Sequence, residues 1–307
     1  MEKIVFEHAL VALDQSEASD IITDCLAQFE RFGTRKFTLF TSVSISYPGG
    51  VGSTDETSYK NRLEAYKEKL ESYDFDVDTE VDFGINAYPP VKILEAAEKK
   101  DVDYIIIGNR GYNKFREFLL GSTATELLQR CPLPVYLINL SVSEESALED
   151  RKLYCVKSCR DSLQNILLPI DFSSTSIRAL RVLKSLSKDE IQNITLLHVQ
   201  ASGRPGVDDP DRLQEFDKED WAYLTKLKTD LESTIEATVE PIIKYGSPVQ
   251  QILDTAKEKS ASMIVMGSQG RGYVSDLFLG GVSLQVIRKA NIPILTIPAD
   301  RSGDDGS

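Results

Sequence analysis

The feature that most constrains the fold of this chain is an internal duplication. The segment YIIIGNRGYNKFREFLLGSTATELL, starting at Tyr104, aligns with MIVMGSQGRGYVSDLFLGGVSLQVI, starting at Met263. Near the start of each copy an apolar run ends on an aspartate, Asp14 in LVALDQS and Asp171 in LLPIDFS. A register kept over so much of the chain indicates two related domains. The glycines of the first copy recur in the second, displaced by 159 positions: Gly108, Gly111 and Gly121 correspond to Gly267, Gly270 and Gly280.

Each copy alternates short apolar runs with amphipathic segments, which is typical of a parallel sheet covered by helices on both faces. We therefore expect an α/β protein with two tandem, open-twisted five-stranded parallel sheets, each in the strand order 3-2-1-4-5. The expected domains are residues 1–140 and 164–299, joined by a polar linker over 141–163. The tail over 300–307 is expected to be disordered.

The expected elements follow from the apolar periodicity. The first copy has strands near 8–13, 36–43, 76–83, 103–107 and 134–139, and helices near 17–31, 56–73, 90–100 and 122–131. The second has strands near 165–170, 193–199, 238–244, 262–266 and 293–298, and helices near 174–188, 213–235, 248–260 and 281–290. Residues at helical spacing predict one buried face on each long helix: Tyr59, Leu63, Tyr66, Leu70 and Tyr73, and then Trp221, Leu224, Leu231 and Ile235.

The charge balance argues against one class of ligand. Acidic residues outnumber basic ones by 48 to 35, the formal net charge is -13, and no basic run occurs. A protein that wraps nucleic acid needs a positive field, so a nucleic acid polymer is not an expected partner. A phosphate held by a helix N-terminus is compatible with this charge. Without a long apolar stretch or an apolar leader, we expect no membrane association and a cytoplasmic location.

The aspartate and the glycine loop are predicted to meet. Ligands of doubly wound sheets bind beyond the carboxyl ends of the strands, where the winding reverses between the first and fourth strands. Asp14 and Gly108 end those strands in the first copy. Glycines permit close backbone approach, and the helix that begins after Gly121 offers free amides to an anion. The alternative is that these glycines only form turns and that Ser122 only caps the helix.

Other side chains give weaker signals. His8 and His198 lie in or beside apolar strands, and a structural role is favoured for both. Cys155 and Cys159 lack the spacing of a zinc site. The loop over 44–57 would overlie the crevice as a lid or as a plain flexible loop. The cations of the glycine loops would screen phosphate or be solvated: Lys114, Arg116 and Arg271.

The loop is neither a Walker loop nor a dinucleotide fingerprint, since both belong after the first strand. Its G-x2-G-x9-G-[ST] pattern and the strand-ending aspartate resemble the universal stress protein family in a tandem form, over about 5–140 and 163–299. The resemblance implies that the aspartate contacts adenine, the loop holds ribose and phosphates, and a backbone group ending the second strand contributes. The implied residues of the first copy are Asp14, Val43 (or Ser42), Gly108, Gly111, Gly121, Ser122 and Thr123. Those of the second are Asp171, Val199, Gly267, Gly270, Gly280, Val282 and Ser283.

The second copy departs from the pattern. Gly281 stands where the family has Ser or Thr, so one phosphate-facing hydroxyl is missing, and Ser283 is a candidate to replace it. LLPIDFS nevertheless resembles the family's first strand more closely than LVALDQS does. The ranking of the two sites stays open.

Three functions are compatible with these features. The first is a stress-response or regulatory protein that binds ATP or AMP, with Mg²⁺ as an optional companion, and signals to an unknown protein partner. The second is an enzyme, either a slow ATPase or a transferase using adenylate chemistry. Neither loop has a histidine or an obvious carboxylate to act as a base, which disfavours fast catalysis but is compatible with slow turnover. The third is a scaffold with vestigial sites. The apolar closing strands PVYLINL and PILTIPA are of the kind that pair, so we expect an intrachain pseudo-dimer and allow for a homodimer.

Overall fold

The computed structural model describes residues 5–45, 56–85, 87–109, 120–142, 153–155, 161–186, 188–201, 210–270 and 279–299. The chain divides into two compact units, unit 1 over Met1–Arg160 and unit 2 over Asp161–Ser307. Several predictions fall outside the described residues: those for Gly111, Lys114, Arg116, Cys159 and Arg271, for most of the 44–57 loop, and for the tail over 300–307.

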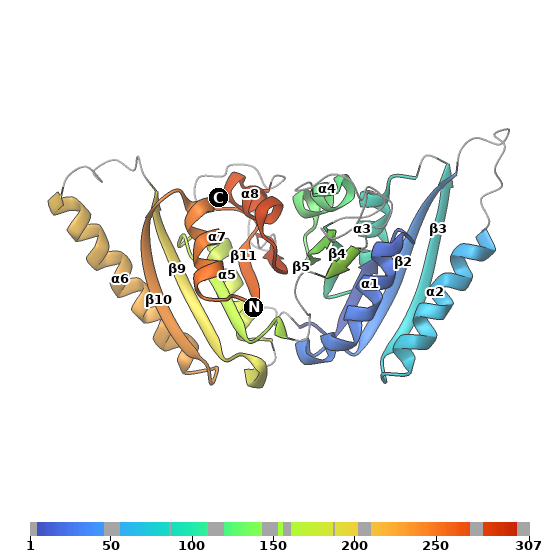
Figure 1. Ribbon diagram of the computed structural model, residues 1–307, viewed down its shortest axis with the longest axis horizontal. Coiled ribbons are helices and arrows are strands. Elements are labelled where there is room, and N and C mark those ends of the chain that lie inside the picture. Colours follow the sequence, from blue (N-terminus) through green and yellow to red (C-terminus); the bar gives the residue numbers. More distant parts are fainter. Residues whose placement is uncertain are drawn as a thin grey trace, which may run out of the picture. The chain divides into compact units, whose positions relative to one another are not determined.

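The strands of unit 1 pair in parallel in the order β3-β2-β1-β4-β5, and helices connect successive strands (Figure 1). Because parallel crossovers are right-handed, the reversal after β3 places α1 and α2 on one face and α3 and α4 on the other. The elements are β1 (His8–Ala12), α1 (Glu17–Leu26), η1 (Ala27–Phe32), β2 (Lys36–Ile45), α2 (Glu56–Glu71), β3 (Asp76–Ile85), α3 (Pro89–Lys99), β4 (Tyr104–Gly108), α4 (Ser122–Arg130) and β5 (Val135–Ile138).

Unit 2 repeats this topology, with its strands in the order β10-β9-β8-β11-β12. The predicted α/β class is confirmed, and the pairing inside each unit is the expected 3-2-1-4-5. The elements are β8 (Asn165–Pro169), α5 (Ser174–Leu183), η3 (Lys188–Glu190), β9 (Asn193–Ala201), α6 (Pro210–Glu232), β10 (Thr238–Gly246), α7 (Pro248–Glu258), β11 (Met263–Gly267), α8 (Gly281–Lys289) and β12 (Ile294–Ile297).

Burial along the strands explains why the central ones are uniformly apolar. Every residue of β4 (YIIIG) and β11 (MIVMG) is buried, because helices cover both faces of these strands. The edge strands β3 and β10 are mostly half-exposed and carry charged residues. The helices α2 and α6 lie along them (Figure 1).

The two long helices bury matched faces, Leu63, Tyr66 and Leu70 in α2 and Leu224, Leu227 and Leu231 in α6. Two residues predicted on these faces are exposed instead, Tyr73 at 54% and Trp221 at 47%. Tyr73 lies beyond the end of α2. In α6 the buried residue is Asp220, which immediately precedes Trp221. The prediction was wrong at these two positions, because Tyr73 lies beyond the helix and the buried face of α6 passes through Asp220 and not through its neighbour Trp221.

The stretch expected to be only a linker contains two short strands. β6 (Leu140–Val142) pairs antiparallel with β7 (Leu153–Cys155), with Ser141 opposite Tyr154. β7 also contacts α1. Segments of three residues carry too little periodicity to be predicted from sequence.

Candidate functional site

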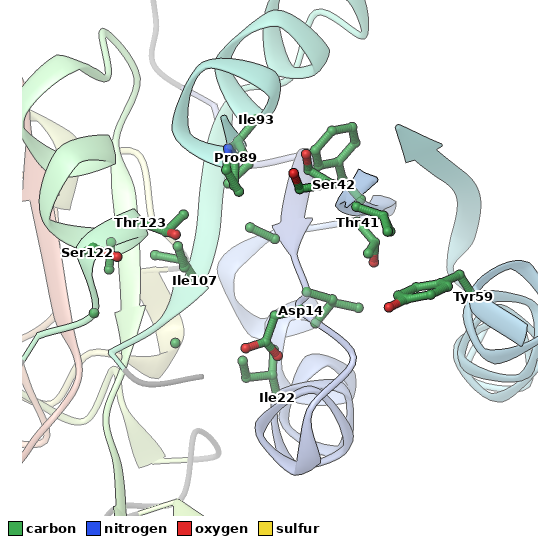
Figure 2. Close-up of a pocket in the computed structure, with 18 residues that line it drawn as sticks. Asp14, Ile22, Thr41, Ser42, Tyr59, Pro89, Ile93, Ile107, Ser122 and Thr123 are labelled. Carbon is green, nitrogen blue, oxygen red and sulfur yellow. The ribbon is translucent and has the colours of Figure 1, made fainter. Parts of the chain in front are cut away.

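A pocket of about 530 Å³ lies in unit 1 at the carboxyl ends of the central strands (Figure 2). Figure 2 shows Ser122 and Thr123 on one side and Thr41 and Tyr59 on the other, with Asp14 between them. Further apolar surface comes from the pocket-lining side chains Phe40, Pro89, Ile93 and Ile107. The structure brings six of the seven residues predicted for the first copy to this pocket: Asp14, Val43, Gly108, Gly121, Ser122 and Thr123.

The carboxylate of Asp14 is fixed by the start of α1. Its Oδ1 accepts hydrogen bonds from the amide of Ser16 at 3.0 Å, the hydroxyl of Ser16 at 2.6 Å and the hydroxyl of Ser19 at 3.2 Å. Gln15, between them, has a φ of 58°, a left-handed conformation that a residue other than glycine rarely adopts. The turn therefore holds Asp14 in one direction at the edge of the pocket.

A backbone hydrogen bond joins the two ends of the glycine loop. The Gly121 amide donates to the Asn109 carbonyl at 2.9 Å, and the Asn109 side chain bonds to Asn139 and to the Leu140 amide. Gly121 is the N-cap of α4 and has no side-chain cap bond. Ser122 is therefore the first residue of the helix and not its cap, so capping does not explain why a hydroxyl stands at this position. The N-terminus of α4 faces the pocket with amides that suit an anion.

Two pocket hydroxyls were not predicted as ligand contacts. Within the described residues, Thr41 Oγ1 and Ser42 Oγ are buried and lack a hydrogen-bond partner, and both residues line the pocket. Leaving a buried hydroxyl unpaired costs about 1–3 kcal/mol. A water or a polar ligand group that reached these hydroxyls would remove this cost. No spacing rule would have identified them, because Thr and Ser are common in strands.

The strand register also decides which residue of the first copy matches Val199. The Leu13 amide donates to the Phe40 carbonyl, and the Ile170 amide donates to the Leu197 carbonyl. This register makes Ser42 the equivalent of Val199, and Val43 is its neighbour. Both Ser42 and Val43 line the pocket.

In unit 2 the corresponding elements approach each other closely. A Cβ built on Gly270 would lie 2.7 Å from Asp171 Oδ2, so the glycine loop lies against the carboxylate. A Cβ on Gly267 would lie 2.8 Å from Thr175 Oγ1 on α5. Gly267 is therefore explained by close packing. Gly280 is the N-cap of α8, as Gly121 is of α4, and Val282 is 39% exposed on that helix.

The hydroxyl of Ser283 has a partner within unit 2. Its Oγ donates to the Gly267 carbonyl at 3.0 Å, and the side chain is buried. Its counterpart by the 159-residue offset is Ala124, which lines the pocket of unit 1. Compensation for Gly281 by Ser283 stays a prediction, and it would require this hydroxyl to exchange the Gly267 carbonyl for a ligand.

Different side chains stand in unit 2 where unit 1 has its pocket wall. By the strand register, His198 replaces Thr41; by the matched helix faces, Asp220 replaces Tyr59. The His198 Nδ1 donates to the Ile170 carbonyl at 2.7 Å, and its Nε2 lies 3.2 Å from Asp220 Oδ2. Gln200 Nε2 donates to the same Oδ2 at 2.9 Å. His198 thus forms part of a buried interaction between β9 and α6, which agrees with the structural role favoured for it.

Comparison with known proteins matches both copies to one family. The model of the universal stress protein family aligns with residues 6–139 and again with residues 162–298. The chain belongs to the universal stress protein family. The double match confirms the tandem repeat inferred from the glycine register.

Relatives of this universal stress protein come in one-copy and two-copy lengths. One from Mycolicibacterium smegmatis is 26% identical over 306 residues, covering 94% of this chain and 96% of the relative. One from Methanocaldococcus jannaschii is 29% identical over 160 residues, covering 45% of this chain and 97% of that protein. The crystal structure of a universal stress protein from Archaeoglobus fulgidus shares the fold, with a TM-score of 0.64 at 23% identity, covering 97% of this chain and 99% of that one.

The described part of this universal stress protein contains no group of three or more His, Cys, Asp or Glu side chains placed to hold a metal ion. No helix in that part is long and apolar enough to cross a membrane.

Proposed function

We propose that this universal stress protein binds an adenine nucleotide, ATP or AMP, in the pocket of unit 1 and acts as a stress-response or regulatory protein. The observation that carries the proposal is the meeting of Asp14 with Gly108, Gly121, Ser122 and Thr123 around one pocket. A volume of about 530 Å³ lies within the usual range for small-ligand sites, about 300–1,000 Å³.

The lining gives each part of the nucleotide a fitting environment. The base would contact Asp14 and the apolar wall formed by Phe40 and Tyr59. The phosphates would face Ser122, Thr123 and the amides that begin α4. A magnesium ion bound with the nucleotide would take ligands from the phosphates and water, since the described residues offer no cluster of three acidic, His or Cys side chains.

We also propose that one nucleotide binds per chain. In unit 2 the hydroxyl at position 281 is missing, Ser283 bonds to Gly267, and His198 and Asp220 occupy the equivalent of the pocket wall. These contacts favour a structural role for unit 2. The association of the two copies through their closing strands, the pairing of two chains, the protein partner and the cytoplasmic location stay predictions.

The test begins with nucleotide released from purified, denatured protein and identified by mass spectrometry. Calorimetric titration of ATP and AMP into ligand-free protein, with and without Mg²⁺, then compares wild type with Gly121→Val and its counterpart Gly280→Val. Among the described residues a Cβ on Gly121 meets only the Asn109 carbonyl, at 3.6 Å, so a valine adds bulk beside the pocket without displacing their backbone.

We expect about one equivalent in wild type and in Gly280→Val, and loss of binding in Gly121→Val. Absence of binding by wild type would overturn the proposal and favour a scaffold. A phosphate-release assay on the same proteins addresses the slow ATPase: turnover that Gly121→Val removes would make this chain an enzyme.

A further inference from the structure

Helix α2 holds the turn that follows Asp14 through one arginine. Arg62 Nη1 donates to the Gln15 carbonyl, and its Nη2 lies 3.3 Å from the Ser16 carbonyl and 2.8 Å from Asp20 Oδ2. Its Nε donates to the Tyr66 hydroxyl at 2.8 Å, which in turn donates to Asp20 Oδ1 at 2.5 Å. One guanidinium thus contacts two backbone carbonyls and one carboxylate of the β1–α1 segment.

The charges in this cluster support each other. Burial raises the pKa of Asp20, but the hydrogen bonds from Tyr66 and Arg62 outweigh it, so the pKa of Asp20 is lowered. The ionised carboxylate therefore stays paired with the guanidinium at neutral pH. Hydrogen bonds with an ionised donor are about twice as strong as neutral ones, and a guanidinium offers several in a fixed plane.

The same turn supports the position of Asp14. Gln15 is left-handed, a conformation that persists only where surrounding contacts enforce it. Its amide donates to Ser19 Oγ at 2.9 Å, and its side chain donates to the Tyr59 carbonyl at 2.8 Å. Because Tyr59 also lines the pocket, α2 contributes both a wall of the pocket and the restraint on the turn beside it.

Unit 2 shows that the turn does not need an arginine in order to form. Phe172 takes the place of Gln15 with a φ of 62°, and Tyr223 takes the place of Arg62. The Phe172 ring stacks on His198 at 4.4 Å and meets the Tyr223 ring edge-on at 4.8 Å. In unit 2, where His198 and Asp220 stand in place of Thr41 and Tyr59, aromatic packing thus replaces the guanidinium.

We propose that Arg62 is a positioning residue that fixes the direction of the Asp14 carboxylate at the pocket and so supports nucleotide binding there. This rests on the proposed nucleotide binding in unit 1. Arg62 acts through the Gln15–Ser16 backbone and does not itself belong to the pocket lining.

The matched control is Lys69, on the same helix. Lys69 forms an ion pair with Asp24 of α1, so Lys69→Met also removes an α1–α2 charge pair but leaves the turn after Asp14 intact. We expect Arg62→Met to weaken ATP binding about tenfold. Lys69→Met should leave the ATP affinity within about twofold of wild type.

A second readout works without nucleotide. The Ser16 amide donates to Asp14 Oδ1, so its hydrogen exchange reports the contact that orients the carboxylate. We expect exchange at Ser16 to speed up about tenfold in Arg62→Met and to stay unchanged in Lys69→Met. Arg62→Lys, which keeps the charge but cannot span both carbonyls and Asp20, should give an intermediate rate and serves if the methionine variant does not fold.

The outcomes separate the two proposals. If wild type binds neither ATP nor AMP, the proposed function falls and the exchange rates alone judge Arg62. If wild type binds ATP but Arg62→Met matches Lys69→Met in both the ATP affinity and the Ser16 exchange rate, the positioning role is overturned.

Discussion

At the residue scale, equivalent glycines of the two copies have different surroundings. Gly267 packs against Thr175 so closely that a Cβ would meet Oγ1 at 2.8 Å, Cβ at 2.9 Å and the carbonyl carbon at 3.0 Å. At Gly121 the nearest atom outside the adjoining residues is the Asn109 carbonyl, at 3.6 Å. Gly267 therefore permits close packing of α5 against β11, whereas Gly121 leaves open space beside the pocket.

We therefore predict that Gly267→Ala destabilises unit 2 by about 1–3 kcal/mol, because α5 must move away from β11. Gly121→Ala should change the stability of unit 1 by less than about 1 kcal/mol. Urea denaturation followed by the fluorescence of Trp221, the single tryptophan and a residue of unit 2, measures the first effect. Combining Gly267→Ala with Thr175→Ala should restore part of the loss, since Oγ1 is removed but the other two atoms remain. Equal stability of Gly267→Ala and wild type would contradict this packing.

His8 provides a pH-dependent term in unit 1. Burial and the nearby Lys36 lower the pKa of His8 below 6.5, although Asp103, Asp78 and Asp76 oppose them. The folded state therefore holds the neutral ring, whose Nε2 lies 2.9 Å from Thr38 Oγ1.

As the pH falls below about 6.5, the unfolded chain takes up a proton that folded His8 does not. We predict that this term destabilises unit 1 progressively from pH 6.5 down to the lower folded-state pKa and is constant below it. An NMR titration of the imidazole should give a pKa below 6.5, with His8→Gln identifying the signal. A pKa of 6.5 would mean that His8 contributes no pH dependence to the stability of unit 1, and a pKa above 6.5 would mean a contribution of the opposite sign.

At the scale of elements, the same strand–helix interface is built in two ways. In unit 1, β2 and α2 leave space beside Thr41 and Tyr59. In unit 2, β9 and α6 join through Asp220, which accepts from Gln200 and lies beside His198, and through Asp217, which also accepts from Gln200. A buried polar network of this kind stabilises only while its members keep their partners.

We predict that Asp220→Ala destabilises unit 2 by about 1–3 kcal/mol, because the buried amide of Gln200 loses an acceptor. The control on the same helix is Asp230→Ala, which removes the ion pair between Asp230 and Lys184. Because the Asp230 side chain is 53% exposed, this loss should lower the free energy of unfolding by less than about 1 kcal/mol. Trp221 fluorescence in urea compares the two variants. Similar midpoints for both would mean that the network adds little stability.

At the scale of the whole molecule, the two units share a topology but differ at their ligand end. We predict that Gly281→Ser, which restores the hydroxyl missing from the second copy, adds no second equivalent of bound nucleotide. The described residues leave room for this substitution, since among them a Cβ on Gly281 meets nothing within 4 Å. His198 and Asp220 still occupy the equivalent of the pocket wall. Calorimetry with ATP measures the stoichiometry, and two equivalents would show that the hydroxyl alone had limited unit 2.

The sequence by itself determined the duplication, the α/β class, the strand order within each unit and the meeting of Asp14 with the glycine loop. These follow from local periodicity and from residues that end strands, and the carboxyl ends of adjacent parallel strands lie at one edge of the sheet. The likeness of the two copies in these features gave no hint that their pocket walls differ.

Only the tertiary structure decided which helix side chains face the ligand end of each sheet. The rotation of α2 against its strands brings Tyr59 and Arg62 to that end in unit 1. The rotation of α6 brings Asp220 and Tyr223 there in unit 2. That rotation is set by packing of the buried faces, which leaves Trp221 exposed and Asp220 buried. Side chains distant in sequence meet only after this packing, so no spacing rule could pair Arg62 with the turn at Gln15.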